Sequence, residues 1–166
     1  MARAVITKPA ILLLDEPLGA LDEKLRIEMQ TELVSLQRKL GMTFIYITHS
    51  QEEALTMSDR VVLMQSGRIA QIGRPIDLFD RPLTRFAAEF MGFENLIPAV
   101  VRSTDSSGVV TVEAVGGHLL RGMSPQRKSI TVGTNVFAAV RAERVQPVSG
   151  VTTELNFLPC KLLDQV

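Results

Sequence analysis

The sequence predicts an α/β protein in two parts, a parallel sheet with a crossover helix followed by a small all-β region. An apolar run without polar alternation, residues 10–14, predicts a central parallel strand that is buried on both faces. Residues 42–48 are rich in β-branched and aromatic side chains, which are typical of a second strand. A helical stripe lies between these two runs. After Gly92, short β-type runs separated by Gly, Ser and Pro replace the helical stripes. We expect one domain over residues 1–94 and a second over residues 95–166.

The composition is that of an ordinary globular protein. The chain has 166 residues, of which 18 are basic and 18 acidic. Its formal net charge is therefore zero, which argues against a nucleic-acid partner. The single cysteine, Cys160, excludes an intramolecular disulfide and fits a reducing compartment. No run approaches the roughly 18 apolar residues of a membrane span, and no secretory signal is present at Met1. We therefore expect a cytoplasmic chain that reaches a membrane only through a partner.

The first predicted strand is bounded by clear signals. Residues 1–7 are expected to form the end of a helix that Lys8 and Pro9 terminate. After the strand and a turn, Asp22 is the expected N-cap of a helix that runs to about residue 40, where Gly41 ends it. The helix carries one apolar stripe, formed by Leu25, Met29, Leu33, Leu36 and Leu40.

The second predicted strand, residues 42–48, ends at His49 and completes a strand–helix–strand unit. Because such crossovers give parallel strands, Asp15, Glu16 and His49 should meet at one edge of the sheet. Ser50 is the expected cap of a short helix, with Glu53 as its capping-box partner.

The remaining elements are short. A hairpin is expected around Ser66 and Gly67, followed by helices over residues 75–79 and 83–91. The all-β region should contain strands over residues 96–102, 109–115, 118–121, 130–132 and 136–141, which suits a small barrel or sandwich. Residues 162–166 form an apolar, strand-like run without a closing turn.

The adjacent acids Asp15 and Glu16 are the first candidates for chemistry. Successive strand residues point to opposite sides, so one carboxylate can address a metal while the other addresses a water molecule. Taken alone, the dipeptide is better explained as two solvated acids after a buried strand. His49 alone is likewise better explained as a histidine that is hydrogen-bonded at the sheet edge.

The combination of these motifs resembles the second half of the nucleotide-binding domain of ABC transporter ATPases, a P-loop NTPase fold. By this resemblance ILLLDEP is the Walker B segment, in which Asp15 supports Mg²⁺ through water and Glu16 is the catalytic carboxylate. His49 matches the switch histidine that contacts the γ-phosphate of ATP. The D-loop, which crosses the dimer interface, is matched by Leu18, Gly19, Ala20, Leu21 and Asp22.

Further residues resemble a narrower group, the importer ATPases of the spermidine/putrescine, iron(III) and sugar classes. The matching segments are GRI at residues 67–69, QIGRP at residues 71–75, Phe79 and the Arg81-Pro82 step. These ATPases carry a carboxyl-terminal accessory barrel of the TOBE type, an OB-like fold. Ala142 departs from the Arg-Pro-Glu of that barrel, and Ser50 replaces an Asp found in many relatives.

The resemblance implies a set of partners. The expected assembly is a homodimer of ATPase subunits bound to transmembrane permease subunits, with an extracytoplasmic solute-binding protein as an indirect partner. The ATPase subunits would then lie peripherally on the inner face of the cell membrane. The sequence does not name the solute, because the permease and the binding protein largely select it.

Three family motifs are absent from the sequence: the Walker A phosphate loop, the Q-loop and the Leu-Ser-Gly-Gly-Gln signature. The nearest decoy, residues 117–124, has Met123 where the phosphate-binding lysine is required. In the family these motifs precede the Walker B segment, so we expect Met1 to be an internal methionine of a longer protein. We also expect this chain alone neither to bind MgATP tightly nor to hydrolyse it, because a phosphate cradle supplies several charge-assisted hydrogen bonds.

Two alternatives remain open. The first is a non-enzymatic regulatory or small-molecule-binding module built on residues 96–166, which saturable binding of a solute would favour. The second is an ABC-type ATPase that works on nucleic acid, which the balanced charge and the importer-like tail argue against.

Overall fold

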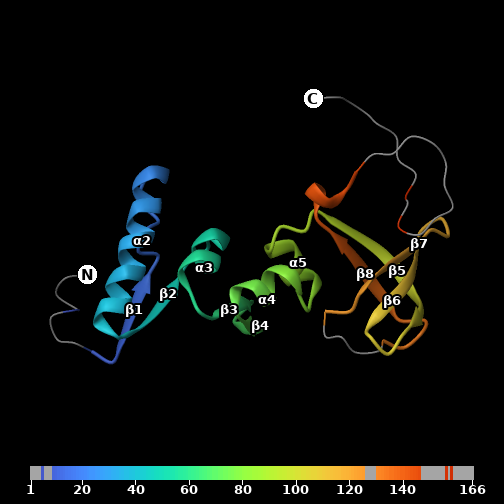
Figure 1. Ribbon diagram of the computed structural model, residues 1–166, viewed down its shortest axis with the longest axis horizontal. Helices are drawn as coiled ribbons and strands as arrows, with labels where there is room; N and C mark the ends of the chain where they lie inside the picture. The colour runs from blue at the N-terminus through green and yellow to red at the C-terminus, as the bar shows by residue number, and fades with distance from the viewer. Residues whose placement is uncertain (1–4, 6–8, 126–129, 147–155, 157, 159–166) are drawn as a thin grey trace. The chain divides into compact units, whose positions relative to one another are not determined.

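The computed structural model describes residues 5, 9–125, 130–146, 156 and 158 (Figure 1). It divides into two compact units, Met1–Asp77 and Leu78–Val166. The domain boundary expected after residue 94 stays a prediction. The helix expected over residues 1–7 lies outside the described residues except for Val5, as do Cys160 and the run at 162–166.

The predicted strand–helix–strand unit is confirmed. Strands β1 (Ile11–Asp15) and β2 (Thr43–Ile47) pair in parallel, from Ile11 opposite Thr43 to Asp15 opposite Ile47. One face of this two-stranded sheet is buried, with Leu12, Leu14 and Met42 at its core. The expectation of a strand buried on both faces was wrong for the described residues, because β1 alternates and Leu13 is 67% exposed.

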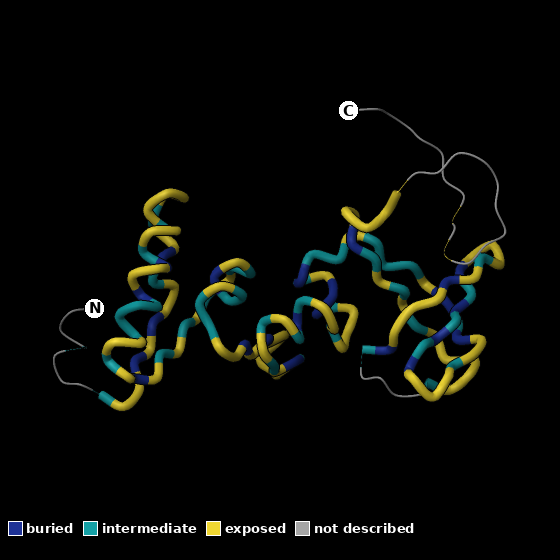
Figure 2. Tube along the Cα trace, in the orientation of Figure 1, coloured by how far each residue is buried: buried dark blue, intermediate teal, exposed yellow. Residues whose placement is uncertain are grey.

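Helix α2 (Glu23–Leu40) connects the two strands and begins and ends at the predicted residues. The Asp22 carboxylate accepts a hydrogen bond from the N–H of Leu25 at 3.0 Å, and Gly41 adopts the left-handed conformation that ends the helix. Within the predicted stripe Leu33 is buried, whereas Leu25 at the start of the helix is exposed. Figure 2 shows buried, intermediate and exposed positions following one another along the helix.

The first unit continues with α3 (Gln51–Met57) and a hairpin of β3 (Val61–Gln65) and β4 (Arg68–Gly73). Ser66 and Gly67 both have positive φ, +49° and +75°, as a type I′ turn requires. Helix α4 (Pro75–Asp80) follows and spans the division between the two units. No helix in the described part of the chain is both long and apolar enough to cross a membrane.

The second unit contains α5 (Arg85–Phe90), capped by Thr84, and a four-stranded antiparallel sheet that curls around its core (Figure 1). The strand order is β7-β6-β5-β8, with bounds Leu119–Met123, Val109–Ala114, Asn95–Thr104 and Asn135–Val140. The core residues are Ala99, Val101, Val110, Val112, Ala114 and Leu120.

The strand expected over residues 130–132 is not formed. Instead, Thr134 donates its N–H to the carbonyl of Thr131 at 3.2 Å, and Gly133 has a φ of +86°. The short apolar run therefore leads into a turn, and Ile130 packs against the sheet core without joining a ladder.

Arg141, which follows β8, lies between two aromatic rings. Its guanidinium carbon is 3.7 Å from the ring centroid of Phe79 and 4.2 Å from that of Phe93. Its nitrogens donate to the carbonyls of Phe79, at 2.9 Å, and Gly92, at 3.4 Å. With Arg141 only 8% exposed, one side chain ties the segments on both sides of α5 to the sheet.

Candidate active site

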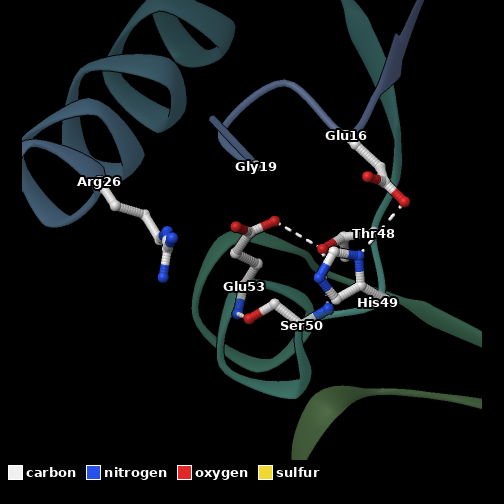
Figure 3. A pocket seen from close by; sticks show the side chains of 7 residues that line it. All are labelled: Glu16, Gly19, Arg26, Thr48, His49, Ser50 and Glu53. Atoms are coloured by element: carbon white, nitrogen blue, oxygen red, sulfur yellow. Dashed lines mark hydrogen bonds and ion pairs between the residues drawn. The ribbon is translucent and has the colours of Figure 1, made fainter. Parts of the chain in front are cut away.

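The carboxyl ends of β1 and β2 bring Glu16 and His49 together. Glu16 directly follows β1, His49 lies in the loop between β2 and α3, and the parallel pairing places both at one edge of the sheet. Nδ1 of His49 lies 3.2 Å from Oε1 of Glu16 (Figure 3). The two side chains are 78% and 55% exposed, so the pair is open to solvent or to a partner. The predicted convergence of these two residues is confirmed.

Asp15 lies at the last position of β1, opposite Ile47, and is also exposed. In the described part of the chain, no group of three or more His, Cys, Asp or Glu could hold a metal ion. A single carboxylate at this edge nevertheless fits Mg²⁺, which commonly takes only one or two protein carboxylates and fills its remaining positions with water and substrate phosphates.

The backbone of Glu16 adopts an unusual conformation. Its φ is +43°, a region that costs a non-glycine residue of the order of 1 kcal/mol or more. Two backbone hydrogen bonds hold it there: its N–H donates to the carbonyl of Ile47 at 2.8 Å, and its carbonyl accepts from Gly19 at 3.2 Å. Strain of this kind is frequent at functional sites.

The predicted D-loop residues differ in their surroundings. Leu18 is 1% exposed and packs inside the first unit, whereas Gly19 and Ala20 are exposed. The carbonyl of Leu21 accepts a hydrogen bond from Arg26, and Asp22 caps α2. Asp22 is exposed as well, so Gly19, Ala20 and Asp22 are the loop residues that can meet a partner directly. The dimer contact itself stays a prediction.

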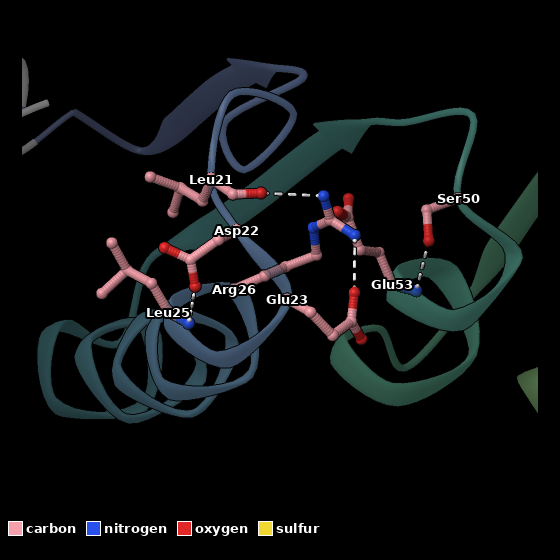
Figure 4. A network of polar contacts seen from close by, with 7 residues as sticks. All are labelled: Leu21, Asp22, Glu23, Leu25, Arg26, Ser50 and Glu53. Carbon is pink, nitrogen blue, oxygen red and sulfur yellow. Dashed lines mark hydrogen bonds and ion pairs between the residues drawn. The ribbon is translucent and has the colours of Figure 1, made fainter.

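Sequence reasoning missed Arg26, which organises the same loop. Its Nη1 bonds Glu23 at 3.0 Å and its Nη2 bonds the Leu21 carbonyl at 2.9 Å (Figure 4). Its Nε is buried and has no hydrogen-bond partner among the described residues. The available signal was its position, one helical turn after the Asp22 cap.

A small pocket of about 60 Å³ lies at the sheet edge, between the loop that follows β1 and the loop that follows β2. Arg26, Glu16 and Gly19 line it from one side, and the segment with Thr48, His49 and Glu53 lines it from the other (Figure 3). Thr48 was also missed as a site residue, and Glu53 was predicted only as a helix cap. The site therefore combines an exposed acid–imidazole pair with a less exposed polar layer beneath it.

Comparison with known proteins identifies relatives that are named as ATP-binding proteins of solute import. No family model matches the chain. The spermidine/putrescine import ATP-binding protein PotA of Rubrobacter xylanophilus is 47% identical over 146 residues, which cover 88% of this chain and 38% of that protein. The protein of the same name from Frankia alni is 45% identical over 152 residues, covering 88% of this chain and 33% of the relative. A third, from Acetivibrio thermocellus, is 54% identical over 112 residues, covering 68% and 31%.

The chain thus spans 38% or less of the length of these three relatives. Within that span the identity is high enough to confirm the resemblance that the motifs indicated. The chain belongs to the family of ATP-binding subunits of ABC importers and matches a part of them.

Proposed function

We propose that this chain supplies the water-activating and γ-phosphate-sensing part of an ATPase site that drives solute import. The observation that carries the proposal is the 3.2 Å approach of His49 Nδ1 to Glu16 Oε1 at the ends of two parallel strands. The relatives' names, which specify ATP binding and import, support it.

Each residue has a chemical role in this proposal. The exposed carboxylate of Glu16 accepts the proton of an attacking water molecule and orients that molecule toward the phosphate. The imidazole of His49 fixes the direction of that carboxylate through Nδ1 and, when both ring nitrogens carry a proton, donates a hydrogen bond from Nε2 to the γ-phosphate. Asp15 supports Mg²⁺ through water, and the ion neutralises charge on the phosphates when it is bound.

The residues fit one half of a nucleotide site. The sequence holds no glycine-rich phosphate loop with its lysine, so we propose that the chain alone neither binds MgATP tightly nor hydrolyses it. The D-loop, through its exposed residues Gly19, Ala20 and Asp22, would meet a second ATPase subunit. Permease subunits, and indirectly a solute-binding protein, would complete an importer at the inner face of the cell membrane.

The second unit supports the accessory-barrel part of the proposal. Its four-stranded curled antiparallel sheet is compatible with a TOBE-type, OB-like domain over residues 95–166. The relatives' names make a polyamine the first solute to test.

The test is ATP hydrolysis by a chimera. In the chimera, this chain replaces the matching segment of the Rubrobacter xylanophilus relative, and the rest of that relative is expected to supply the phosphate loop and the signature. We expect the chimera to hydrolyse ATP and the 166-residue chain to show no hydrolysis above the buffer blank. A correctly folded chimera without ATPase activity contradicts the proposal.

A further inference from the structure

The cap of α3 departs from the expected capping box. Ser50 Oγ accepts the N–H of Glu53 at 3.3 Å, as predicted. In the usual reciprocal bond the Glu53 carboxylate would accept the N–H of Ser50. Here that N–H donates instead to Thr48 Oγ1 at 2.9 Å, and the Thr48 hydroxyl donates to Glu53 Oε2 at 2.6 Å. A hydroxyl group is thus inserted into the capping box.

The direction of these bonds is fixed by chemistry. The N–H of Ser50 can only donate, so the Thr48 oxygen accepts from it, and the single hydroxyl proton is left for Glu53. Glu53 is 7% exposed, and 2.6 Å is typical of a hydroxyl bonded to an ionised carboxylate. The Thr48 hydroxyl oxygen therefore accepts one bond and donates the other, which the methyl groups of valine cannot do.

The Thr48 hydroxyl links the residues on either side of His49. The bond from Ser50 N to Thr48 Oγ1 closes a small ring across His49, and Glu53 anchors that ring to the first turn of α3. The imidazole itself is 78% exposed, so burial does little to fix its direction. Figure 3 shows Thr48 and Glu53 bonded to each other beside the His49 ring, which is directed to Glu16.

From this geometry we infer that Thr48 and Glu53 are positioning residues that hold the His49 loop so that the imidazole meets Glu16. The inference deepens the proposed function and rests on it for its catalytic consequence. The geometric part is independent, because it concerns a contact within this chain.

The competing explanation is that the network only stabilises α3. Ser50 already caps that helix through its own side chain. Under the competing explanation, loss of the Thr48 hydroxyl would lower helix stability without changing the His49–Glu16 contact. Thr56 offers a matched control, because its hydroxyl also bonds within α3, to the Glu52 carbonyl at 2.8 Å, and does not touch the His49 loop.

The first experiment is nuclear magnetic resonance of the histidine ring nitrogens in the full chain at one fixed pH. With only two histidines, His49 is assigned by comparison with His118→Gln. Glu16→Gln defines the ring signals without the carboxylate partner. We expect Thr48→Val to shift the His49 signals toward those of Glu16→Gln, and Thr48→Ser and Thr56→Val to keep the parent signals.

Several results would overturn the inference. They are parent-like signals in Thr48→Val, a Thr48→Ser variant that behaves like Thr48→Val, and an equal shift in Thr56→Val. If Glu16→Gln leaves the His49 signals unchanged, the contact itself is absent and the inference fails. Glu53→Gln gives a second test if Thr48→Val does not fold: its amide oxygen still accepts the hydroxyl, so parent-like signals are expected and a shifted ring contradicts the inference.

The second experiment measures ATP hydrolysis in the chimera. Thr48→Val should lower kcat by about 10- to 100-fold with KM for ATP changed less than about threefold, because displaced catalytic groups mainly affect the chemical step. Thr48→Ser, which keeps the hydroxyl, should have a kcat close to that of the parent chimera. An active chimera whose kcat is unaffected by Thr48→Val refutes the positioning role, whereas an inactive parent chimera refutes the proposed function and leaves the resonance test to decide the geometry.

Discussion

The imidazole of His49 lies 3.2 Å from the carboxylate of Glu16, although 33 positions separate them in the sequence. Parallel pairing of β1 with β2 explains this, because it brings both strand ends to one edge. The backbone N–H of Glu16 extends the pairing by donating to Ile47 at 2.8 Å. The position of the site thus depends on the register in which the two strands pair.

The positive φ of Glu16 predicts that glycine stabilises this position. We expect Glu16→Gly to be more stable to unfolding than Glu16→Ala by about 0.5 to 1 kcal/mol, because glycine avoids the left-handed penalty and offsets its larger unfolded-state entropy. Ala20, which is exposed and has no positive φ, gives the control: Ala20→Gly should destabilise. Denaturant unfolding measures both, and equal stability of the two Glu16 variants would remove the strain argument.

Arg141 stacks on two aromatic rings and bonds two carbonyls, and this arrangement, here called the Arg141 clamp, predicts that lysine cannot replace arginine at position 141 without loss of stability. Arg141→Lys should lower the free energy of unfolding of the second unit by about 2 kcal/mol, because an ammonium group cannot stack on Phe79 and Phe93 while bonding two carbonyls. Arg144→Lys, at an exposed position of the adjacent 3₁₀ turn, should change stability by less than about 0.5 kcal/mol. Thermal unfolding followed by circular dichroism compares the two, and similar losses would contradict the clamp.

The backbone N–H of Ala142 donates to the carboxylate of Glu94 at 3.0 Å, and this bond is the main reason that the pKa of Glu94 is lowered. Ala142→Pro removes the N–H, so the pKa of Glu94 should rise toward its ordinary value. Titration of the side-chain carboxyl by nuclear magnetic resonance measures the change. Asp105, whose pKa is lowered chiefly by the Ser107 hydroxyl, is the internal control and should not move.

The same bond has a consequence for stability. A pKa lowered by folding stabilises the protein above the unfolded-state pKa of the group, and that stabilisation is lost as the pH falls through the folded-state pKa. The acid-side loss of stability in the parent should therefore exceed that in Ala142→Pro. An equal pH dependence in the two proteins would contradict a folding contribution from Glu94.

Local signals in the sequence predicted much of the first unit. Asp22 and Gly41 bound α2, the Ser66-Gly67 turn forms the hairpin, and the crossover brings Glu16 and His49 to one edge. These features depend on capping, turn chemistry and strand pairing, each of which involves residues near in sequence or one crossover apart.

Other features could not be predicted because they depend on contacts that no local pattern encodes. Arg141 meets Phe79 across 62 positions of sequence, and its stacking follows from tertiary packing. The Thr48 hydroxyl bonds both the N–H of Ser50 and the carboxylate of Glu53, and a capping-box pattern, which considers only those two residues, does not include it. The positive φ of Glu16 could not be predicted either, because glutamate usually avoids the left-handed region and nothing in its residue type signals it.

The central claim is that Glu16 activates water at the sheet edge. Its most direct test is the turnover of the chimera with Glu16→Gln, which keeps the shape of the side chain and removes its basicity. We expect kcat to fall by a factor of the order of 10² to 10⁴ with nucleotide binding retained, because the general base is lost. Unchanged turnover in Glu16→Gln would contradict it.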